Sequence, residues 1–195
     1  LTGSVRAGSR VMELASKSVK RVALELGGKS ANIILEDADL EKAISDGLTD
    51  AFRNAGQVCG GLSRTLVPRS RLAEAEEIAA ARAARFVMGD PFDEATTLGP
   101  VVSAVQRDRI RGYIQVGIDE GMRLVAGGPD APENLERGYF VRPTVFSGSN
   151  HDTLARQEVF GPVNVMIPFD DEDDAISIAN DSDYGLAGGV WAADP

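Results

Sequence analysis

Residues 22–35 read Val22-Ala23-Leu24-Glu25-Leu26-Gly27-Gly28-Lys29-Ser30-Ala31-Asn32-Ile33-Ile34-Leu35, and this stretch indicates the fold. Two short apolar runs, residues 22–26 and 31–35, flank the Gly27-Gly28 pair, which predicts two strands separated by a break. Asp39 follows as a good helix N-cap. It precedes apolar residues at helical spacing, namely Leu40, Ala43, Ile44, Gly47, Leu48, Ala51 and Phe52.

The same alternation extends in both directions. Upstream, Ser4 is the predicted N-cap of a helix that runs to about residue 20. Downstream, we expect strands near 63–67, 122–126, 140–146, 163–168 and 187–192, and helices near 72–86, 103–120 and 172–180. In the helix at 103–120 the residues expected to face inward are Ile110, Tyr113, Ile114 and Ile118. Strands that alternate with helices predict an α/β fold with a mainly parallel sheet flanked by helices.

Composition and charge exclude several classes of function. The chain has 195 residues, 43% of them hydrophobic, and a formal net charge of −10. That negative charge opposes non-specific binding to nucleic acid or to an anionic membrane, so neither is expected as a partner. No apolar run approaches the roughly 20 residues needed to span a bilayer. Because the sequence opens on Leu1 rather than on Met, we expect it to be a piece of a longer protein.

The chain has one cysteine, Cys59, and one histidine, His151. A lone cysteine forms no internal disulfide, which favours a reducing compartment and a cytoplasmic location. These counts exclude most zinc sites, and no metal site is predicted. If Cys59 is a nucleophile, its helper is expected to be a carboxylate.

Cys59 stands in the segment Gly56-Gln57-Val58-Cys59-Gly60-Gly61. Glycines on both sides let a small electrophile approach the sulfur, and a neighbouring backbone N–H can stabilise an oxyanion. These features indicate a nucleophile. The alternative is an inert buried cysteine, which is common in cores.

Glu25 is the only acid between Val22 and Leu26. Burial in an apolar strand would raise the pKa of its carboxyl by desolvation, which suits a general base near neutral pH. The alternatives are a strand residue that points outward or an ion pair with Lys29.

Two short motifs suggest phosphate binding. Gly28-Lys29-Ser30 resembles the end of a P-loop, but Ala23 stands where that motif needs glycine and a strand follows, so we reject this interpretation. Gly3-Ser4 opens a helix in a basic region, since residues 1–30 carry six basic and two acidic side chains. The N-terminal N–H groups of this helix could bind an anion. The alternative is an ordinary N-cap on a helix with a solvated basic face, which has the same sequence pattern.

A compact turn and an acidic run complete the candidates. In Glu158-Val159-Phe160-Gly161-Pro162 the acid could bind a sugar hydroxyl and the ring could stack on a flat cofactor. The alternative is a loop that Phe160 anchors in the core. The acids at 170–174 are expected to begin the helix that follows rather than to bind a cation.

Taken together and in order, these pieces resemble the aldehyde dehydrogenase superfamily from end to end. The pair of blocks Glu25-Leu26-Gly27-Gly28-Lys29 and Gly56-Gln57-Val58-Cys59, about 30 residues apart, is highly specific. The other matching segments are Leu1-Thr2-Gly3-Ser4, Leu98-Gly99-Pro100, Tyr139-Phe140-Val141-Arg142-Pro143-Thr144, Glu158-Val159-Phe160-Gly161-Pro162, Asn180 and Tyr184-Gly185-Leu186-Ala187-Gly188-Gly189.

The resemblance implies the oxidation of an aldehyde to a carboxylic acid with NAD or NADP, through a cysteine thiohemiacetal and thioester. Cys59 would be the nucleophile and Glu25 the base that activates the deacylating water. The implied cofactor contacts are Gly3 and Ser4 at the pyrophosphate, Leu26 at the nicotinamide amide, Glu158 at the nicotinamide ribose, Phe160 beside it, and Gln106 on the cofactor side.

The resemblance also divides the chain. Residues 1–26 would be the tail of the NAD(P)-binding domain, and residues 27–195 most of the thiol-bearing catalytic domain. The full-length protein is expected to be a homo-oligomer, and this piece alone to be inactive. Two alternatives stay open: a coenzyme A-acylating aldehyde dehydrogenase, and a family member kept for structure or binding without catalysis.

Overall fold

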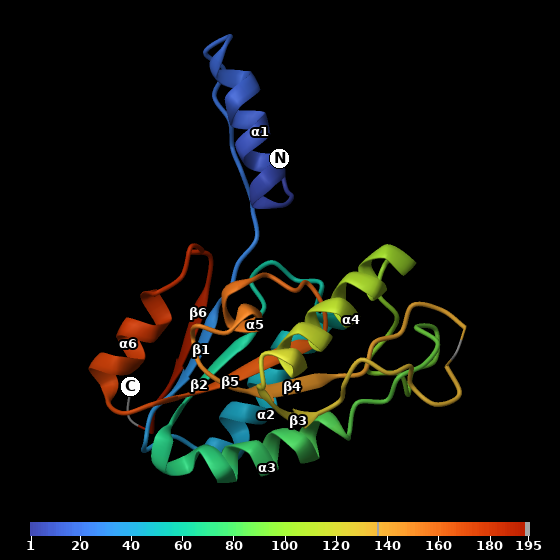
Figure 1. Ribbon diagram of the computed structural model, residues 1–195, viewed down its shortest axis with the longest axis vertical. Coiled ribbons are helices and arrows are strands. Elements are labelled where there is room, and N and C mark those ends of the chain that lie inside the picture. The colour runs from blue at the N-terminus through green and yellow to red at the C-terminus, as the bar shows by residue number, and fades with distance from the viewer. Residues whose placement is uncertain (136, 194–195) are drawn as a thin grey trace.

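The computed structural model describes residues 1–135 and 137–193 (Figure 1). Its strands are β1 (Ala31–Ile34), β2 (Arg64–Pro68), β3 (Arg123–Ala126), β4 (Thr144–Ser147), β5 (Val163–Phe169) and β6 (Gly188–Trp191). Its α-helices are α1 (Val5–Ser16), α2 (Leu40–Phe52), α3 (Leu72–Ala83), α4 (Ala104–Asp119), α5 (Thr153–Arg156) and α6 (Glu172–Asn180). Two short 3₁₀ turns, η1 (Arg53–Gly56) and η2 (Arg69–Arg71), complete the elements.

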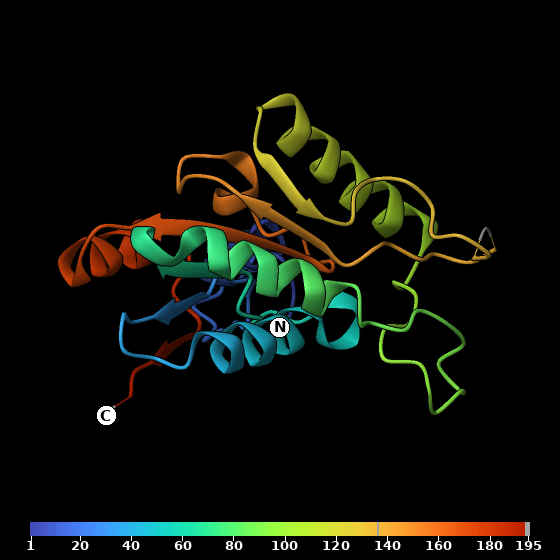
Figure 2. The same ribbon diagram turned by 90° about the horizontal axis from the view of Figure 1, so that it is seen from below.

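The strands form one sheet in the order β3-β4-β5-β2-β1-β6. Every neighbouring pair is parallel except β3 and β4, which are antiparallel. Helix α2 lies on one side of this sheet, and α4 and α5 lie on the other (Figure 2). All residues of the interior strand β2 are buried, as expected for a parallel strand with both faces covered. The predicted α/β fold with a mainly parallel sheet is confirmed.

The predicted helix caps form as expected. Ser4 accepts a hydrogen bond from the Ala7 N–H at 3.2 Å, and Asp39 accepts one from the Lys42 N–H at 3.0 Å. The acidic run begins α6, because Asp171 accepts a hydrogen bond from the Asp174 N–H at 2.9 Å. Each such cap stabilises its helix by about 1 kcal/mol.

Three predictions of local structure are wrong in part. Residues 22–26 form no strand, only a single bridge between Thr2 and Glu25, and no described strand lies beside them to extend the pairing. The strand expected at 140–146 is confined to Thr144–Ser147, because Pro143 has no N–H to donate to a sheet. In α4 the buried residues are Ile110, Ile114 and Gly117, whereas Ile118 is exposed, because Gly117 packs against Leu154.

Helix α1 projects away from the sheet (Figure 1). Of its residues only Gly8 is buried, against the side chain of Leu26. The Thr2–Glu25 bridge holds the start of this segment near the body, through hydrogen bonds from the Gly3 N–H to the Glu25 carbonyl and from the Glu25 N–H to the Leu1 carbonyl. Within residues 1–135 and 137–193, no helix is both long enough and apolar enough to cross a membrane.

Candidate active site

One pocket of about 220 Å³ gathers most of the predicted site residues. It lies between the start of α1, the segment before β1, the loop after α2 and the loop before β5. Its lining residues are Thr2, Gly3, Ser4, Glu25, Leu26, Gly27, Cys59, Arg109, Glu158 and Phe160. Of the residues predicted from sequence, only Gln106 is absent from its wall. Segments more than 100 residues apart in the chain therefore form a single site.

Cys59 is exposed at this pocket, which excludes the alternative of an inert buried cysteine. The chain reaches Cys59 through three consecutive left-handed residues, Asn54, Ala55 and Gly56, with φ of 51°, 54° and 70°. Such conformations cost about 1 kcal/mol or more at residues other than glycine, and persist where the surroundings enforce them. They turn the chain sharply at the end of α2.

The side chain of Gln57 holds this turn in place. Its amide Nε2 donates to the Asn54 carbonyl at 3.1 Å, and its Oε1 accepts from the Val102 N–H at 2.9 Å. Both ends of one amide are therefore used to tie the loop that carries Cys59 to the segment before α4.

Glu25 lies at the same pocket, but its surroundings differ from the prediction. The expected burial of its carboxylate in an apolar strand is wrong, because Glu25 is exposed and residues 22–26 form no strand. The alternative of an ion pair with Lys29 also fails, since no such pair forms in the described part of the chain and the Lys29 side chain is buried. Glu25 thus lines the pocket as an exposed residue.

Glu158 is half-buried and accepts a hydrogen bond from the Gly28 N–H at 3.3 Å. Its carboxylate packs against Gly27, where any side chain would collide with it. Desolvation raises the pKa of Glu158, and the Gly28 N–H, Arg109 and Lys29 oppose that rise. Within residues 1–135 and 137–193 only Oε1 of this carboxylate is hydrogen-bonded. A partly desolvated carboxylate of this kind suits a neutral hydroxyl as its partner.

Phe160 takes a left-handed backbone conformation with φ of 56°. The side chain of Gln106 holds it there, because its Nε2 donates to the carbonyls of Phe160 at 2.8 Å and Val159 at 3.3 Å. Phe160 lines the pocket and is half-buried rather than fully enclosed in the core. Gln106 itself sits behind this loop, so its direct contact here is with the protein backbone.

Gly3 and Ser4 line the pocket at the N-terminus of α1. The helix has 12 residues, and no acidic side chain lies in its first turn. Its N-terminal N–H groups and dipole therefore present partial positive charge to the pocket.

Arg109 is a site residue that the sequence reasoning missed. It lines the pocket from α4, lies over the Tyr113 ring at 5.6 Å, and donates to the Glu158 carbonyl at 3.5 Å. Its spacing of three residues from Gln106 places both on one face of α4, and that spacing was the available signal. In the described part of the chain no group of His, Cys, Asp and Glu could hold a metal ion.

The fold and the pocket define a thiol-bearing α/β protein with carboxylates and a helix N-terminus around one site. The profile of the aldehyde dehydrogenase family matches residues 1–195, and the chain belongs to that family.

Comparisons with individual proteins agree. The chain is 50% identical over 190 residues to a 3-succinoylsemialdehyde-pyridine dehydrogenase from a Pseudomonas species, covering 97% of this chain and 40% of that protein. It superposes with a TM-score of 0.97 and 48% identity on a mutant aldehyde dehydrogenase C from Pseudomonas syringae in complex with NAD⁺ and octanal, covering 99% of this chain and 40% of the other. An aldehyde dehydrogenase from Mycobacterium tuberculosis with NAD⁺ gives a TM-score of 0.96 at 48% identity, with the same coverage. The chain thus spans about 40% of the length of these relatives.

Proposed function

We propose that the whole protein oxidises an aldehyde to a carboxylic acid with NAD or NADP as the oxidant. The observation that carries this proposal is the single pocket lined by Cys59, Glu25 and Glu158 at the N-terminus of α1. The NAD⁺ complexes of the two structural relatives support the choice of cofactor.

In this reaction the Cys59 thiolate attacks the carbonyl carbon of the aldehyde to form a thiohemiacetal. Loss of hydride from that carbon leaves a thioester, and the nicotinamide, when bound, supplies the hydride acceptor. Glu25 then takes a proton from water as the water attacks the thioester, which releases the acid and restores the thiol. A thiol with a carboxylate and no histidine is sufficient for these two steps.

The residues around the pocket fit a dinucleotide. The N-terminus of α1, with Gly3 and Ser4, would face the pyrophosphate, where a helix end favours an anion. The Glu158 carboxylate would accept hydrogen bonds from ribose hydroxyls, and the Phe160 ring and Leu26 carbonyl would lie beside the nicotinamide. Gln106 would not contact the cofactor directly. It would position Phe160, because its side chain donates a hydrogen bond to the Phe160 carbonyl.

We further propose that residues 1–26 belong to a cofactor-binding domain and residues 27–195 to the catalytic domain. The projection of α1 from the sheet supports this division (Figure 1). On this proposal the 195-residue chain by itself does not oxidise aldehydes, because it carries only one helix of the cofactor domain. That the whole protein forms a homo-oligomer stays a prediction.

The test is the full-length parent protein with a panel of aldehydes and with NAD⁺ or NADP⁺, followed by the absorbance of the reduced cofactor. We expect reduced cofactor and free acid in equal amounts. Formation of an acyl-coenzyme A only when coenzyme A is added would instead support the acylating alternative. No turnover with any aldehyde would contradict the proposal.

A further inference from the structure

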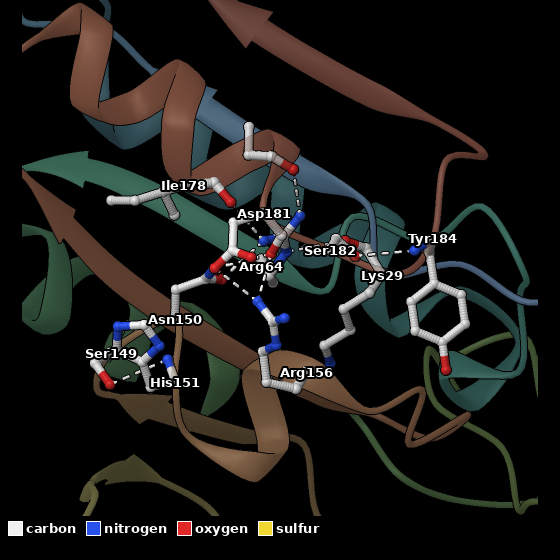
Figure 3. A network of polar contacts seen from close by, with 11 residues as sticks. Lys29, Arg64, Ser149, Asn150, His151, Arg156, Ile178, Asp181, Ser182 and Tyr184 are labelled. Carbon is white, nitrogen blue, oxygen red and sulfur yellow. Dashed lines mark hydrogen bonds and ion pairs between the residues drawn. The ribbon is translucent and has the colours of Figure 1, made fainter.

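The Arg64 side chain is buried at the start of β2, with 2% of its surface exposed. Its Nε donates to the Lys29 carbonyl at 2.9 Å. Its Nη1 donates to Asn150 Oδ1 at 2.8 Å and to the Ile178 carbonyl at 2.9 Å, and its Nη2 donates to the Ala179 carbonyl at 2.9 Å. Figure 3 shows Arg64 among these neighbours. All three guanidinium nitrogens therefore bind oxygens from segments far apart in the chain.

The two ends of the guanidinium have different partners. Ile178 and Ala179 lie in the last turn of α6, where carbonyls have no partner within the helix and the helix dipole favours a cation. That end accounts for the burial of the charge, since in the part of the chain that the structure describes no carboxylate lies within ion-pair distance of Arg64. The Nε end instead reaches the segment that leads out of the candidate active site.

That segment begins with Gly27 and Gly28, which contact Glu158. The Glu158 carboxylate packs against Gly27 and accepts a hydrogen bond from the Gly28 N–H at 3.3 Å. Glycines leave the backbone free to take many conformations, so the course of this pair depends on what holds the chain at either end. On the side before the pair, Glu25 exchanges backbone hydrogen bonds with residues 1–3.

Arg64 holds the chain on the side after the pair. Its Nε binds the carbonyl of Lys29, which directly follows Gly28, and its backbone N–H donates to the Ser30 carbonyl at 3.2 Å. The backbone contact would remain with any residue but proline at position 64. The contact to the Lys29 carbonyl depends on the arginine side chain.

We propose that Arg64 is a positioning residue, whose Nε contact to the Lys29 carbonyl holds the Gly28 N–H where it donates to Glu158. This inference rests on the proposed function, in which Glu158 accepts hydrogen bonds from the ribose of the cofactor. Without the Nε contact the glycine pair shifts, the Glu158 carboxylate loses its fixed orientation, and the cofactor binds more weakly.

Two substitutions at position 64 separate the two ends of the guanidinium. Arg64→Gln places an amide nitrogen after the same number of side-chain carbons as Nε, so it keeps a donor for the Lys29 carbonyl but loses the charge and the contacts to α6. Arg64→Lys keeps the charge and the reach to α6, but a methylene group replaces Nε. A pocket of about 390 Å³, lined by Lys29, Arg64 and Ala179 among others, gives water access to either side chain, so both variants are expected to fold.

The direct test is the Gly28 amide signal in NMR spectra of the ¹⁵N-labelled 195-residue chain between pH 3 and pH 8. The signal of an N–H that donates to a carboxylate follows the ionisation of that carboxylate, and burial raises the pKa of Glu158 above its ordinary value. We expect a clear titration in the parent chain and in Arg64→Gln, and the loss of most of it in Arg64→Lys. Urea unfolding should rank the variants in the opposite order, with Arg64→Gln the less stable, because it loses more contacts.

The second measurement is calorimetric titration of the full-length protein with NAD⁺ in the absence of aldehyde. Arg64→Lys should raise the Kd about fivefold, the scale of one hydrogen bond, and Arg64→Gln should raise it less. Asn150→Ala is the matched control within the same network, because it removes an Nη1 partner and leaves the Nε contact. Its Kd should equal that of the parent protein.

A Gly28 titration in Arg64→Lys equal to that of the parent would overturn the proposal. So would a titration or a Kd that follows stability across the three variants, since a structural role alone predicts that order. Failure of Arg64→Lys to fold would also count against it, because the Nε contact would then serve the fold as a whole. If Arg64→Gln fails to fold, Asn150→Ala replaces it as the variant that keeps the Nε contact.

The NMR measurement involves neither cofactor nor aldehyde, so the two proposals fail separately. A full-length protein that binds no NAD⁺ would contradict the proposed function, while the Gly28 titration would still decide the role of Arg64.

Discussion

The carboxylate of Glu158 accepts a hydrogen bond at 3.3 Å from the backbone N–H of Gly28, a residue 130 positions earlier in the chain. Gly28 in turn lies so close to the Cys59 carbonyl that an added Cβ would come within 2.6 Å of it. The segments that carry Glu25, Cys59 and Glu158 therefore meet at a pair of glycines, which fixes the pocket from three sides.

The first prediction concerns the thiol. In the full-length protein, Cys59→Ser should lower kcat by several orders of magnitude, because a hydroxyl replaces the covalent nucleophile. The measurement is steady-state production of reduced cofactor, with circular dichroism to verify folding. A variant that keeps more than about a tenth of the parent kcat would remove Cys59 from the mechanism.

The second prediction separates the two half-reactions. Glu25→Gln in the full-length protein should release one equivalent of reduced cofactor per site and then stall at the thioester, since water is no longer activated. Rapid-mixing absorbance measures the burst, and mass spectrometry of the quenched protein detects the acyl group. An unchanged steady-state rate would show that another group activates the water.

The third prediction concerns the turn that presents Cys59. Gly56→Ala should destabilise the 195-residue chain by at least about 2 kcal/mol, because φ at Gly56 is 70° and a Cβ would overlap the Gly161 backbone. The free energy of unfolding in urea measures this. Gly112→Ala is the matched control, since Gly112 lies inside α4 with open space around it, and there alanine should stabilise by about 0.5–1 kcal/mol. Equal effects at the two positions would contradict the steric account.

The fourth prediction is a pH dependence that arises from Lys29. Its folded-state pKa of about 7 lies below the ordinary 10.5, so between these values the unfolded chain binds the additional proton. Stability then rises with pH across that interval, and below about pH 7 the full cost of the buried charge is present. Lys29→Met removes this cost.

We therefore expect Lys29→Met to have a higher Tm than the parent chain at pH 6. The difference should shrink as pH rises from 7 to 10.5, as recorded by thermal unfolding in buffers without carboxylates. A Tm difference that does not change with pH would mean that the Lys29 charge is not the cause.

The fifth prediction concerns the cofactor. The isolated 195-residue chain should bind NAD⁺ and NADP⁺ more weakly than about 100 μM, a binding free energy of roughly 5 kcal/mol, because Gly3, Ser4 and Glu158 meet only part of a dinucleotide. Isothermal titration calorimetry gives the dissociation constants directly. Tighter binding of either cofactor would show that this chain completes the site by itself.

Much of the fold could be predicted from short-range patterns. The caps at Ser4 and Asp39, the acidic start of α6 and the apolar spacing of α2 follow from rules that act over a few residues, and the structure confirms them. Residues 22–26 show the limit of such rules. Their apolar pattern is that of a strand, but a strand also needs a hydrogen-bonding neighbour of similar length. Among the described residues only the short segment 1–3 hydrogen-bonds to them, and it forms a single bridge, between Thr2 and Glu25.

The sequence by itself determined the alternation of strands and helices, the family, and the residues that could carry chemistry, because glycine pairs, caps and a lone thiol are local features. Only the tertiary structure decided which of these residues share a pocket. Arg109 joins the site, Gln106 supports it from behind, and Lys29 lies buried on another cavity. Those placements depend on contacts between segments far apart in the chain. Such contacts form only in the folded protein, where packing and desolvation determine which side chains lie together.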